Sequence, residues 1–560
     1  MRTRAVAAST PGSPSGAASS PPATVSPFRA DVPGSAATGG TEVDAGGRRL
    51  RRTTWHIGAP LLAVQAAVLI ALSVVQYHRF ALSFDFATYY QAWWLIGHGH
   101  LDPFSTTLGI PFVANDFELL MWPLALLTKV STSPLVLLTV EDLAVVATNA
   151  VTLSWALAVL ERSGVPVLRR QAIAAFALVS LLLNPWCYET ALWAFHPSPI
   201  VALLAVLAGR DLWRGTDRRL LLWTPLLVLT GLVGVLSVLG LGVTALILGR
   251  HRWHVGLPLA AVGLGMLLVL GELHLVGAGG NFTTDAFAYL LPPHPGQVSS
   301  IRIAAAVVQH PGRVAAVLAG TAPVVLLFLF PVGVLGAATR WAVGMELTIL
   351  VPPALAKSVA FDLQPGLAFQ VWPALPFVLI GTVMLLGSAR WPRAAASRRL
   401  VLATGACLLV TVLTAAVWFP YVLGQWIPGV TSGTTTLLAR LERGVPVRDE
   451  LIVWAPLAGR FAARANLRAI VLPEMVIPVD RRVVTVVLAH GDLGVALPLA
   501  AADTFAHRLV ALDHATLLER RDGVTVLRWY PSPAVRSIAF PSAALSTSGP
   551  REFSIYAPPG

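Results

Sequence analysis

The sequence predicts a mainly α-helical, polytopic membrane protein with a small α/β domain near its C-terminus. Of its 560 residues, 55% are hydrophobic and only 12% are charged, and the mean hydropathy is +0.70. A soluble domain carries about 25% charged residues, so much of this chain must face lipid. The net charge of +12 comes mostly from arginines clustered between apolar runs, the positive-inside pattern. We therefore expect the lipid bilayer as a partner and no nucleic acid.

Residues 1–52 are expected to form a disordered cytoplasmic tail. They are rich in Ala, Ser, Pro, Thr and Gly and cannot bury enough apolar surface to offset chain entropy. The arginines of "RRLRR" then hold the start of the first span, 57–77, in the cytoplasm, so residue 78 lies outside. No apolar core precedes these arginines, so a cleaved signal peptide is not expected.

The membrane domain is predicted over residues 53–424, with about ten spans in the plasma membrane. Apolar runs of about 20 residues suit a hydrocarbon core about 30 Å thick. The glycines of "GLVGVLSVLGLG" indicate close helix packing. After the first, the predicted spans are 134–160, 171–188, 197–213, 220–249 as two short crossings or a re-entrant pair, 255–276, 314–336, 341–356, 371–387 and 401–420.

An extracytoplasmic α/β domain is predicted over residues 425–530. "RDELIVWAPLAGRFAARANLRAIVLP" is typical of strand, helix and strand, and "RRVVTVVLA" of a further strand. "AADTFAHRLVAL" indicates a helix and "ATLLERRDGVTVLRWY" a hairpin with Asp-Gly near its turn. Residues 531–560, rich in Pro and Ser, are expected to be a loose tail.

The long first outer loop, 78–118, gathers four acids in a chain with few of them: Asp85, Asp102, Asp116 and Glu118. Phe86, Tyr90, Trp93 and Trp94 recur at helical spacing, which favours a helix lying in the headgroup layer. Asp85 would stand at the start of that helix. It is either a catalytic carboxylate or a helix cap without chemistry.

Further candidates lie in other outer loops. "NPWCYETALWAFHPSPI" supplies Glu189 and His196, and the latter could equally be a satisfied loop histidine. Arg302 and Lys357 could hold a lipid phosphate, or simply snorkel at helix ends. The two cysteines have no partner at ligand spacing and nucleotide motifs are lacking, so no cofactor is expected and a divalent cation has no support.

Three stretches resemble the bacterial membrane proteins called domain of unknown function 2079: "FDFATYYQAWWLIGHGHLDPFST", "NDFELLMWPLALLTKVSTSPLVLL" and "AFHPSPI". The family's Phe-Asp and following Gln match Phe84, Asp85 and Gln91. Asp116 stands where the family has His, and Ser198 stands where its Phe-His-Pro-Glu motif has Glu. A Lys-Glu-Asp motif and a His-Tyr motif are also missing, so the resemblance implies a divergent member.

That family is similar in layout to GT-C type membrane glycosyltransferases, which transfer sugar from a polyprenyl-phosphate carrier to an acceptor outside the membrane. A shared layout does not establish a shared reaction. The resemblance implies Asp85 as general base, Asp116 as a ligand of the acceptor or a cation, and His196 as a phosphate contact. It further implies Gln91 and Glu118 as substrate contacts, and Arg302 or Lys357 as the cation that neutralises the phosphate.

Two other classes of function stay open. The missing acidic motifs favour a catalytically degenerate scaffold whose outer domain binds a partner. A transporter is the third alternative, although neither an internal repeat nor central charges are seen. Convergence of Asp85, Asp116 and His196 would favour the transferase, and scattered carboxylates the scaffold.

Overall fold

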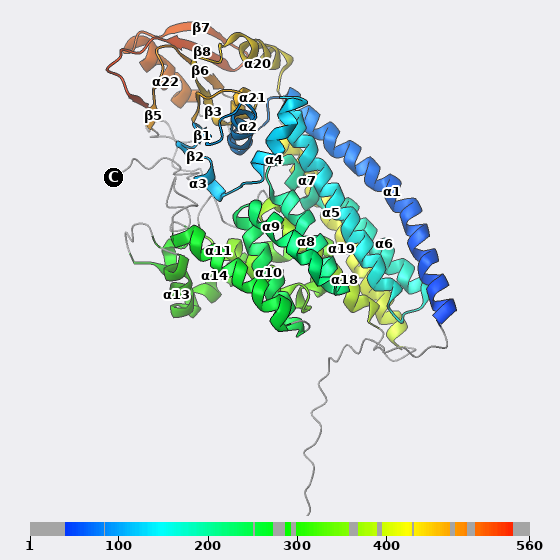
Figure 1. Cartoon of the computed structure of the whole chain (residues 1–560). Coiled ribbons are helices and arrows are strands. Elements are labelled where there is room, and N and C mark those ends of the chain that lie inside the picture. The colour runs from blue at the N-terminus through cyan, green and yellow to red at the C-terminus, as the bar shows by residue number, and fades with distance from the viewer. Residues whose placement is uncertain are drawn as a thin grey trace, which may run out of the picture. The chain divides into compact units, whose positions relative to one another are not determined.

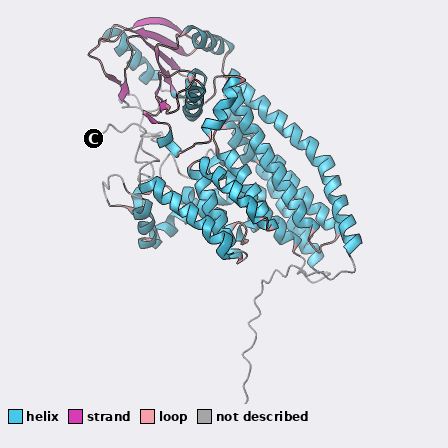
Figure 2. Ribbon diagram, viewed as in Figure 1, coloured by secondary structure: helices cyan, strands magenta, loops and turns pink. Residues whose placement is uncertain are grey.

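The computed structural model describes residues 40–82, 84–249, 252–272, 286–292, 298, 300–357, 368–388, 395–427, 430–470, 476–489 and 499–540. By its contacts the chain divides into Met1–Ala45 and Gly46–Gly560, and the second unit is the one considered below. Most elements are helices, and the larger sheet lies in the C-terminal part (Figure 2). The predicted fold class, mainly α with many apolar helices and a small C-terminal sheet, is confirmed.

Seven of the described helical segments are long and apolar enough to cross a membrane, and two shorter apolar ones, Leu232–Leu248 and Val343–Leu355, accompany them. The helices of this part are α1 (Gly40–His78), α5 (Leu135–Glu161), α6 (Val167–Leu183), α7 (Pro185–Leu192), α8 (Ser198–Arg214), α9 (Leu220–Leu229), α10 (Leu232–Leu248), α11 (Leu257–Glu272), α13 (Ser300–Gln309), α14 (Pro311–Leu329), α15 (Val343–Met345), α16 (Val351–Leu355), α17 (Ala368–Val371), α18 (Leu375–Gly387) and α19 (Ala395–Trp426) (Figure 1).

The first helix begins earlier than expected. Helix α1 starts at Gly40, inside the segment assigned to the tail, and carries the arginines of "RRLRR" as part of its length. Long-chain residues such as arginine favour helix, so the apolar span extends backward through them. The predicted 220–249 segment is indeed two short helices, because Gly231, at φ 86°, separates α9 from α10.

Large apolar side chains cover the outside of several of these helices. Val64 and Val68 on α1, and Leu402, Leu409 and Val417 on α19, are 40–69% exposed. A soluble protein rarely exposes contiguous apolar surface of this extent, so these faces are suited to lipid. Interior residues instead form one core of the bundle, with Trp155, Trp186 and Trp372 almost fully buried.

Helices α10 and α11 pack with their backbones in close contact. A Cβ added at Gly242 would lie 2.3 Å from the backbone nitrogen of Ala260, and one at Gly263 would lie 2.6 Å from that of Leu239. No side chain fits at these distances, so the glycines set the approach of the two helices. The close packing predicted from "GLVGVLSVLGLG" is therefore what the structure contains.

The C-terminal elements form an α/β unit. A five-stranded sheet has the order β4-β3-β6-β8-β7, parallel from β4 to β6 and antiparallel from β6 to β7. The hairpin turns at Asp522-Gly523, both with positive φ, as predicted. The elements are α20 (Ser432–Gly444), β3 (Glu450–Trp454), α21 (Ala458–Phe461), β4 (Leu467–Ile470), β5 (Val476–Pro478), β6 (Val484–Ala489), α22 (Leu499–Ala511), β7 (Thr516–Arg521), β8 (Val524–Trp529) and β9 (Ser537–Ala539).

The segment expected to be a loose tail contains a strand. β9 pairs antiparallel with β5, with Ile477 opposite Ile538, and Ile538 and Phe540 are buried. These apolar side chains complete the core of the α/β unit, which composition alone could not reveal because Pro and Ser dominate the segment. Residues 541–560 lie outside the described part of the chain.

The helix predicted to lie in the headgroup layer is instead buried in protein. Helix α2 (Phe84–Gly97) has ten buried residues among its 14 and packs against α21 and α4 (Met121–Ala125). A helix that is apolar on all sides is buried rather than half-exposed, and the aromatic face that suggested an interfacial helix is only part of its apolar surface. Two short strands, β1 (Phe104–Ser105) and β2 (Ile110–Pro111), and helix α3 (Val113–Asp116) complete the segment 78–118, which the sequence predicted to be the first outer loop.

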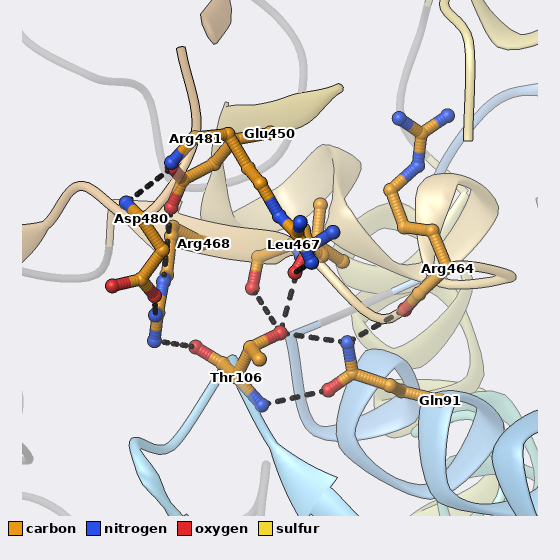
Figure 3. Close-up of polar contacts among 9 residues, drawn as sticks. Gln91, Thr106, Glu450, Arg464, Leu467, Arg468, Asp480 and Arg481 are labelled. Carbon is orange, nitrogen blue, oxygen red and sulfur yellow. Dashed lines mark hydrogen bonds and ion pairs between the residues drawn. The ribbon is translucent and has the colours of Figure 1, made fainter. Parts of the chain in front are cut away.

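A hydrogen-bonded seam joins this outer loop to the α/β unit (Figure 3). The Gln91 amide donates to Thr106 Oγ1 at 2.7 Å and to the Arg464 carbonyl at 2.9 Å, and its oxygen accepts from the Thr106 N–H at 2.9 Å. Thr106 Oγ1 in turn donates to the Leu467 carbonyl at 2.6 Å and accepts from the Leu467 N–H at 3.1 Å. Strand β4 is an edge strand, so the loop satisfies backbone groups that a sheet edge leaves free.

Charged side chains extend the same seam. Arg468 Nη1 donates to the Thr106 carbonyl at 3.1 Å, and its guanidinium also pairs with Asp480 and, at 3.4 Å, with Glu450. Glu450 is fully buried and accepts from the Asp480 and Arg481 N–H groups at 2.8 and 3.1 Å. Because the buried Glu450 carboxylate is fully hydrogen-bonded, it holds Arg468 in place. Arg468 in turn joins the sheet to the loop through the Thr106 carbonyl.

Replacing Thr106 by valine tests the seam. Thr106→Val keeps the volume but leaves the Gln91 amide and the Leu467 N–H without their buried partner, so we expect a loss of about 1–3 kcal/mol in unfolding free energy. The exposed Thr436→Val is the matched control and should change stability by less than about 0.5 kcal/mol. Thermal unfolding in detergent measures both, and equal effects would show that the seam contributes nothing.

A second contact holds α21 against the end of α1. The Arg460 guanidinium lies 3.8 Å from the Tyr77 ring centroid and 4.2 Å from that of Phe80, pairs with Glu442 and donates to the Tyr77 carbonyl at 2.7 Å. Next to it, a Cβ at Gly459 would lie 2.4 Å from the Leu82 carbonyl oxygen. These contacts define the backbone that leads directly into α2.

Candidate active site at one end of the bundle

The α7–α8 connection presents the histidine predicted from "AFHPSPI". Asn184 caps α7 by accepting from the Trp186 N–H at 3.1 Å, and Pro185 occupies the first helical position. The helix ends at Leu192, and Ala194 then adopts φ 72°, a left-handed conformation that is unfavourable for alanine. This reversal turns the buried Phe195 and His196 back toward α2.

Asp85 meets this connection across the structure. It lies in the first turn of α2 and is partly buried, and its Oδ2 accepts from Trp193 Nε1 at 3.1 Å. Among the contacts of the described residues, this is the hydrogen bond that its carboxylate makes, so Oδ1 is left for another donor. The carboxylate is not used to cap its own helix, which disfavours the interpretation of Asp85 as a cap alone.

His196 is held in one protonation state and one tautomer. Its backbone N–H donates to Glu141 Oε1 at 3.1 Å, and its Nδ1 lies 3.0 Å from the Ala194 carbonyl oxygen. A carbonyl only accepts, so Nδ1 carries the hydrogen and Nε2 keeps its lone pair. Burial lowers the pKa of His196, with Asp85 and the Ala194 carbonyl acting in the opposite direction. The neutral ring therefore offers an acceptor rather than a proton.

Aromatic rings surround the histidine. The His196 ring lies 5.1 Å from that of Tyr89 and 4.6 Å from that of Phe369, centroid to centroid. Tyr89 belongs to α2 and Phe369 to α17, so three separate segments of the chain meet here. The Tyr89 hydroxyl also donates to Glu118 Oε1 at 3.0 Å. The predicted site residue Glu118, which is 5% exposed, is therefore buried next to Tyr89.

Three buried acids lie beside this site, and two of them escaped the sequence prediction. Glu141 and Asp142 on α5 and Glu189 on α7 are fully buried within helices. Asp142 accepts from the Ser73 hydroxyl at 2.9 Å. Ionisable residues within spans are costly and usually functional, and the pair "ED" inside the apolar run 134–160 was the signal that could have found them. These acids lie near the ends of their apolar spans and not at their centres.

Glu189 differs from its neighbours in its contacts. Neither carboxylate oxygen makes a hydrogen bond of good geometry, although the N–H groups of Ala368 and Phe369 at the start of α17 face it. The Glu141 carboxylate uses one oxygen to hold the His196 loop. Glu141 is thus a positioning residue for the histidine, whereas the contacts of Glu189 assign it no such role.

The remaining predicted site residues are not all brought together. Gln91 is fully buried and its amide is used in the seam, which leaves it a structural rather than a substrate-binding role. Asp116 ends α3, and the placement of its side chain lies outside the described part of the chain. Arg302 and Lys357 are exposed; Arg302 belongs to α13, which carries a small apolar cluster of its own, and the Lys357 N–H donates to the Ala286 carbonyl at 2.7 Å.

Left-handed backbone recurs at the segments that build the site. Of the five described non-glycine residues with positive φ, three are Phe80, Phe117 and Ala194. They precede Asp85, Glu118 and His196 by one to five residues. Each such conformation costs about 1–3 kcal/mol and persists only where surrounding packing imposes it, a pattern common at functional sites.

The described residues do not form a metal centre. No group of three or more His, Cys, Asp or Glu side chains among them has an arrangement that could hold a metal ion. What the site has is the Asp85 carboxylate, with one oxygen free of hydrogen bonds to the described residues, and the neutral His196 ring, both in contact with Trp193. Such a carboxylate can accept the proton of a hydroxyl group. This arrangement fits a hydroxyl better than the phosphate that the sequence suggested for His196.

The pH dependence of stability tests the state of His196. Because burial lowers its pKa, protons bind first to the unfolded chain, whose histidine titrates near 6.5, as pH falls. This histidine's contribution is therefore present above about pH 6.5 and is lost below it. We expect the Tm of the wild type to fall more than that of His196→Gln between pH 8 and pH 5.5. Exposed His100→Gln should follow the wild type, and parallel curves for all three would contradict the assignment.

Comparison with solved structures gives a weak likeness in fold. No family model matches the chain, and no curated protein matches it. A solved structure, ArnT from Cupriavidus metallidurans bound to undecaprenyl phosphate, is similar at a TM-score of 0.45 and 13% identity, over 84% of this chain and 97% of that chain. A likeness of this strength does not establish a shared reaction. The class defined by the fold is a multi-helix membrane protein, and the resemblance to domain of unknown function 2079 stays a prediction.

Proposed function

We propose that this protein is a membrane glycosyltransferase that transfers sugar from a polyprenyl-phosphate carrier to a hydroxyl acceptor outside the membrane. The observation that carries the proposal is the convergence of Asp85 and His196, which lie more than 100 residues apart in the sequence, on Trp193: its Nε1 donates to Asp85, and its ring centroid lies 6.2 Å from that of His196. The prediction for a transferase site also included Asp116, whose side chain lies outside the described residues; the meeting of Asp85 and His196 supports the proposal.

In the proposed reaction Asp85 acts as the general base. Its Oδ1 takes the proton of the acceptor hydroxyl while the hydroxyl oxygen forms a bond to the anomeric carbon of the sugar. The bond from that carbon to the carrier phosphate oxygen breaks, and the electron pair leaves on the phosphate. Trp193 holds Oδ2 in place. The reacting hydroxyl has one proton, which goes to Asp85, so the His196 lone pair is proposed to accept from a second hydroxyl of the acceptor and to position it in this way.

The same scheme gives proposed roles to residues farther from Asp85. Asp116 is proposed to contact the acceptor, and Glu118 to keep Tyr89 against the histidine. Lys357 stands on the segment that leads to α17, whose Phe369 contacts His196, and with Arg302 it is proposed to neutralise the carrier phosphate. By the positive-inside rule, the site lies on the outer side of the membrane.

Transfer of labelled sugar from polyprenyl-phosphate donors in membranes that contain the full chain tests this function. We expect a product that depends on the protein and on a hydroxyl acceptor. Membranes carrying Asp85→Asn at matched expression are the control for the site. No transfer from any donor of a broad panel, with correctly folded wild type, would favour the catalytically degenerate scaffold instead.

A further inference from the structure

Arginines from four elements gather at the opposite end of the bundle. We call Arg51, Arg162, Arg210, Arg214 and Arg219 the arginine cluster. A Cβ at Gly47 of α1 would lie 3.3 Å from Glu161 Cγ at the end of α5, which places the starts and ends of these helices together. The Arg162 guanidinium, just after α5, lies 4.3 Å above the Trp213 ring of α8.

The five arginines of this cluster outnumber the acids near them, which are Asp211, Asp217 and Glu161. Arg214, Arg219 and Arg51 all repel Arg210, and Asp211 is the carboxylate that attracts it. Asp211 is fully buried; its Oδ2 accepts from Trp223 Nε1 at 3.0 Å, and its Oδ1 makes no hydrogen bond and lies 3.8 Å from Arg219 Nη1. Like charges held this close are unfavourable unless an anion joins them.

Arg210 itself lacks an acceptor. Its Nε is buried without a hydrogen-bond partner, and among the described residues no hydrogen bond ends on its guanidinium. A guanidinium presents its N–H groups as a planar fork that matches two phosphate oxygens. A buried N–H donor without an acceptor is unfavourable, so the local structure favours a bound oxyanion at this position.

Apolar and aromatic residues next to the cluster are suited to a lipid. Leu221 and Leu222, two and three residues after Arg219, are 79% and 55% exposed. Trp213 and Trp223 lie at the same end, where indole rings favour the boundary between headgroups and acyl chains. A soluble phosphate would use the arginines but not these exposed leucines.

We propose that the arginine cluster is a binding site for the phosphate group of an anionic membrane phospholipid, with Arg210 and Arg51 as ligands. The phosphate oxygens satisfy the Arg210 donors and relieve the repulsion among the arginines. The acyl chains lie along the exposed leucines of α9. By the positive-inside rule this end faces the cytoplasmic leaflet, where anionic lipid attracts basic side chains.

Thermal unfolding of the full chain in neutral detergent tests the site, with phosphatidylglycerol added against phosphatidylcholine. Arg51→Gln/Arg210→Gln is the test variant, and Arg448→Gln/Arg482→Gln, two exposed arginines near the sheet, is the control of equal charge change. We expect phosphatidylglycerol to raise the Tm of the wild type and the control. Each cluster arginine should contribute roughly fivefold in apparent lipid affinity, so the double variant should bind about 30-fold more weakly.

The variants also report whether the fold is intact. Neither Arg51 nor Arg210 makes a hydrogen bond to the described residues, so the Tm in phosphatidylcholine should not fall. If it does fall, Arg51→Gln alone, at an exposed position, should still show the roughly fivefold loss. An equal response of all variants to phosphatidylglycerol would overturn the proposal. An equal Tm shift from inorganic phosphate would also overturn it, because the ligand would then be a soluble anion.

Discussion

Asp85→Asn is expected to lower sugar transfer by about 10²- to 10⁴-fold, the usual contribution of a positioned general base. Asparagine keeps the shape, and its amide oxygen can still accept from Trp193 Nε1, so the helix start should remain as it is. What is lost is the ability of the group to take a proton. The loss should therefore appear in kcat with little change in KM for the acceptor.

Asp102→Asn provides the matched control for this variant. Asp102 lies in the same outer loop, is exposed, and has the same chemistry without a contact to Trp193 or His196. Its transfer rate should stay within about twofold of the wild type, as expected for a surface substitution away from the site. A transfer reaction that survives Asp85→Asn while the protein remains folded would remove Asp85 from the role of base.

Arg460→Leu should produce the largest loss of stability, about 3 kcal/mol in unfolding free energy. The Arg460 side chain is 7% exposed and is shared by a carboxylate, a backbone carbonyl and two aromatic faces. Removing one partner of a buried pair leaves the other, here Glu442, without compensation. Because Tyr77 and Phe80 lead into α2, transfer activity should fall with stability.

Arg440→Leu is the control, since its ion pair with Glu519 is similar in kind but 56% exposed on the arginine side. An exposed pair contributes about 0–1 kcal/mol, so this variant should unfold near the wild type. Thermal unfolding and limited proteolysis near residue 460 measure the two together. If both variants unfold alike, the Arg460 contact does not hold the α/β unit against α1.

The hydrophobic periodicity of the sequence predicted most helices and strands, because the formation of each depends mainly on the residues within it. The runs 134–160 and 197–213 correspond to α5 and α8 within one residue, since about 20 apolar residues allow little besides a spanning helix. The hairpin at Asp522-Gly523 followed from local turn chemistry for the same reason. The strand β9 could not be found in this way, because its pairing with β5 is a contact across about 60 residues.

The candidate site shows the same division. Asp85 and His196 were recognisable as single residues, since ionisable side chains beside spans are few. Their convergence was not, because it depends on the left-handed turn at Ala194 and on the Glu141 carboxylate that holds the following loop. Gln91 looked like a ligand for the opposite reason: nothing local indicates that its amide bonds to Arg464, 373 residues away.

The sequence by itself determined that this is a membrane protein with a mainly helical fold, a small C-terminal sheet and arginine-rich ends of helices. Hydropathy and charge act through the solvent that surrounds each segment, so they can be read one segment at a time. Only the tertiary structure decided that α2 is buried against the α/β unit and that Asp85 meets Trp193 and His196. Those outcomes depend on packing and hydrogen bonds between distant segments, whose energies exist only once the chain has folded.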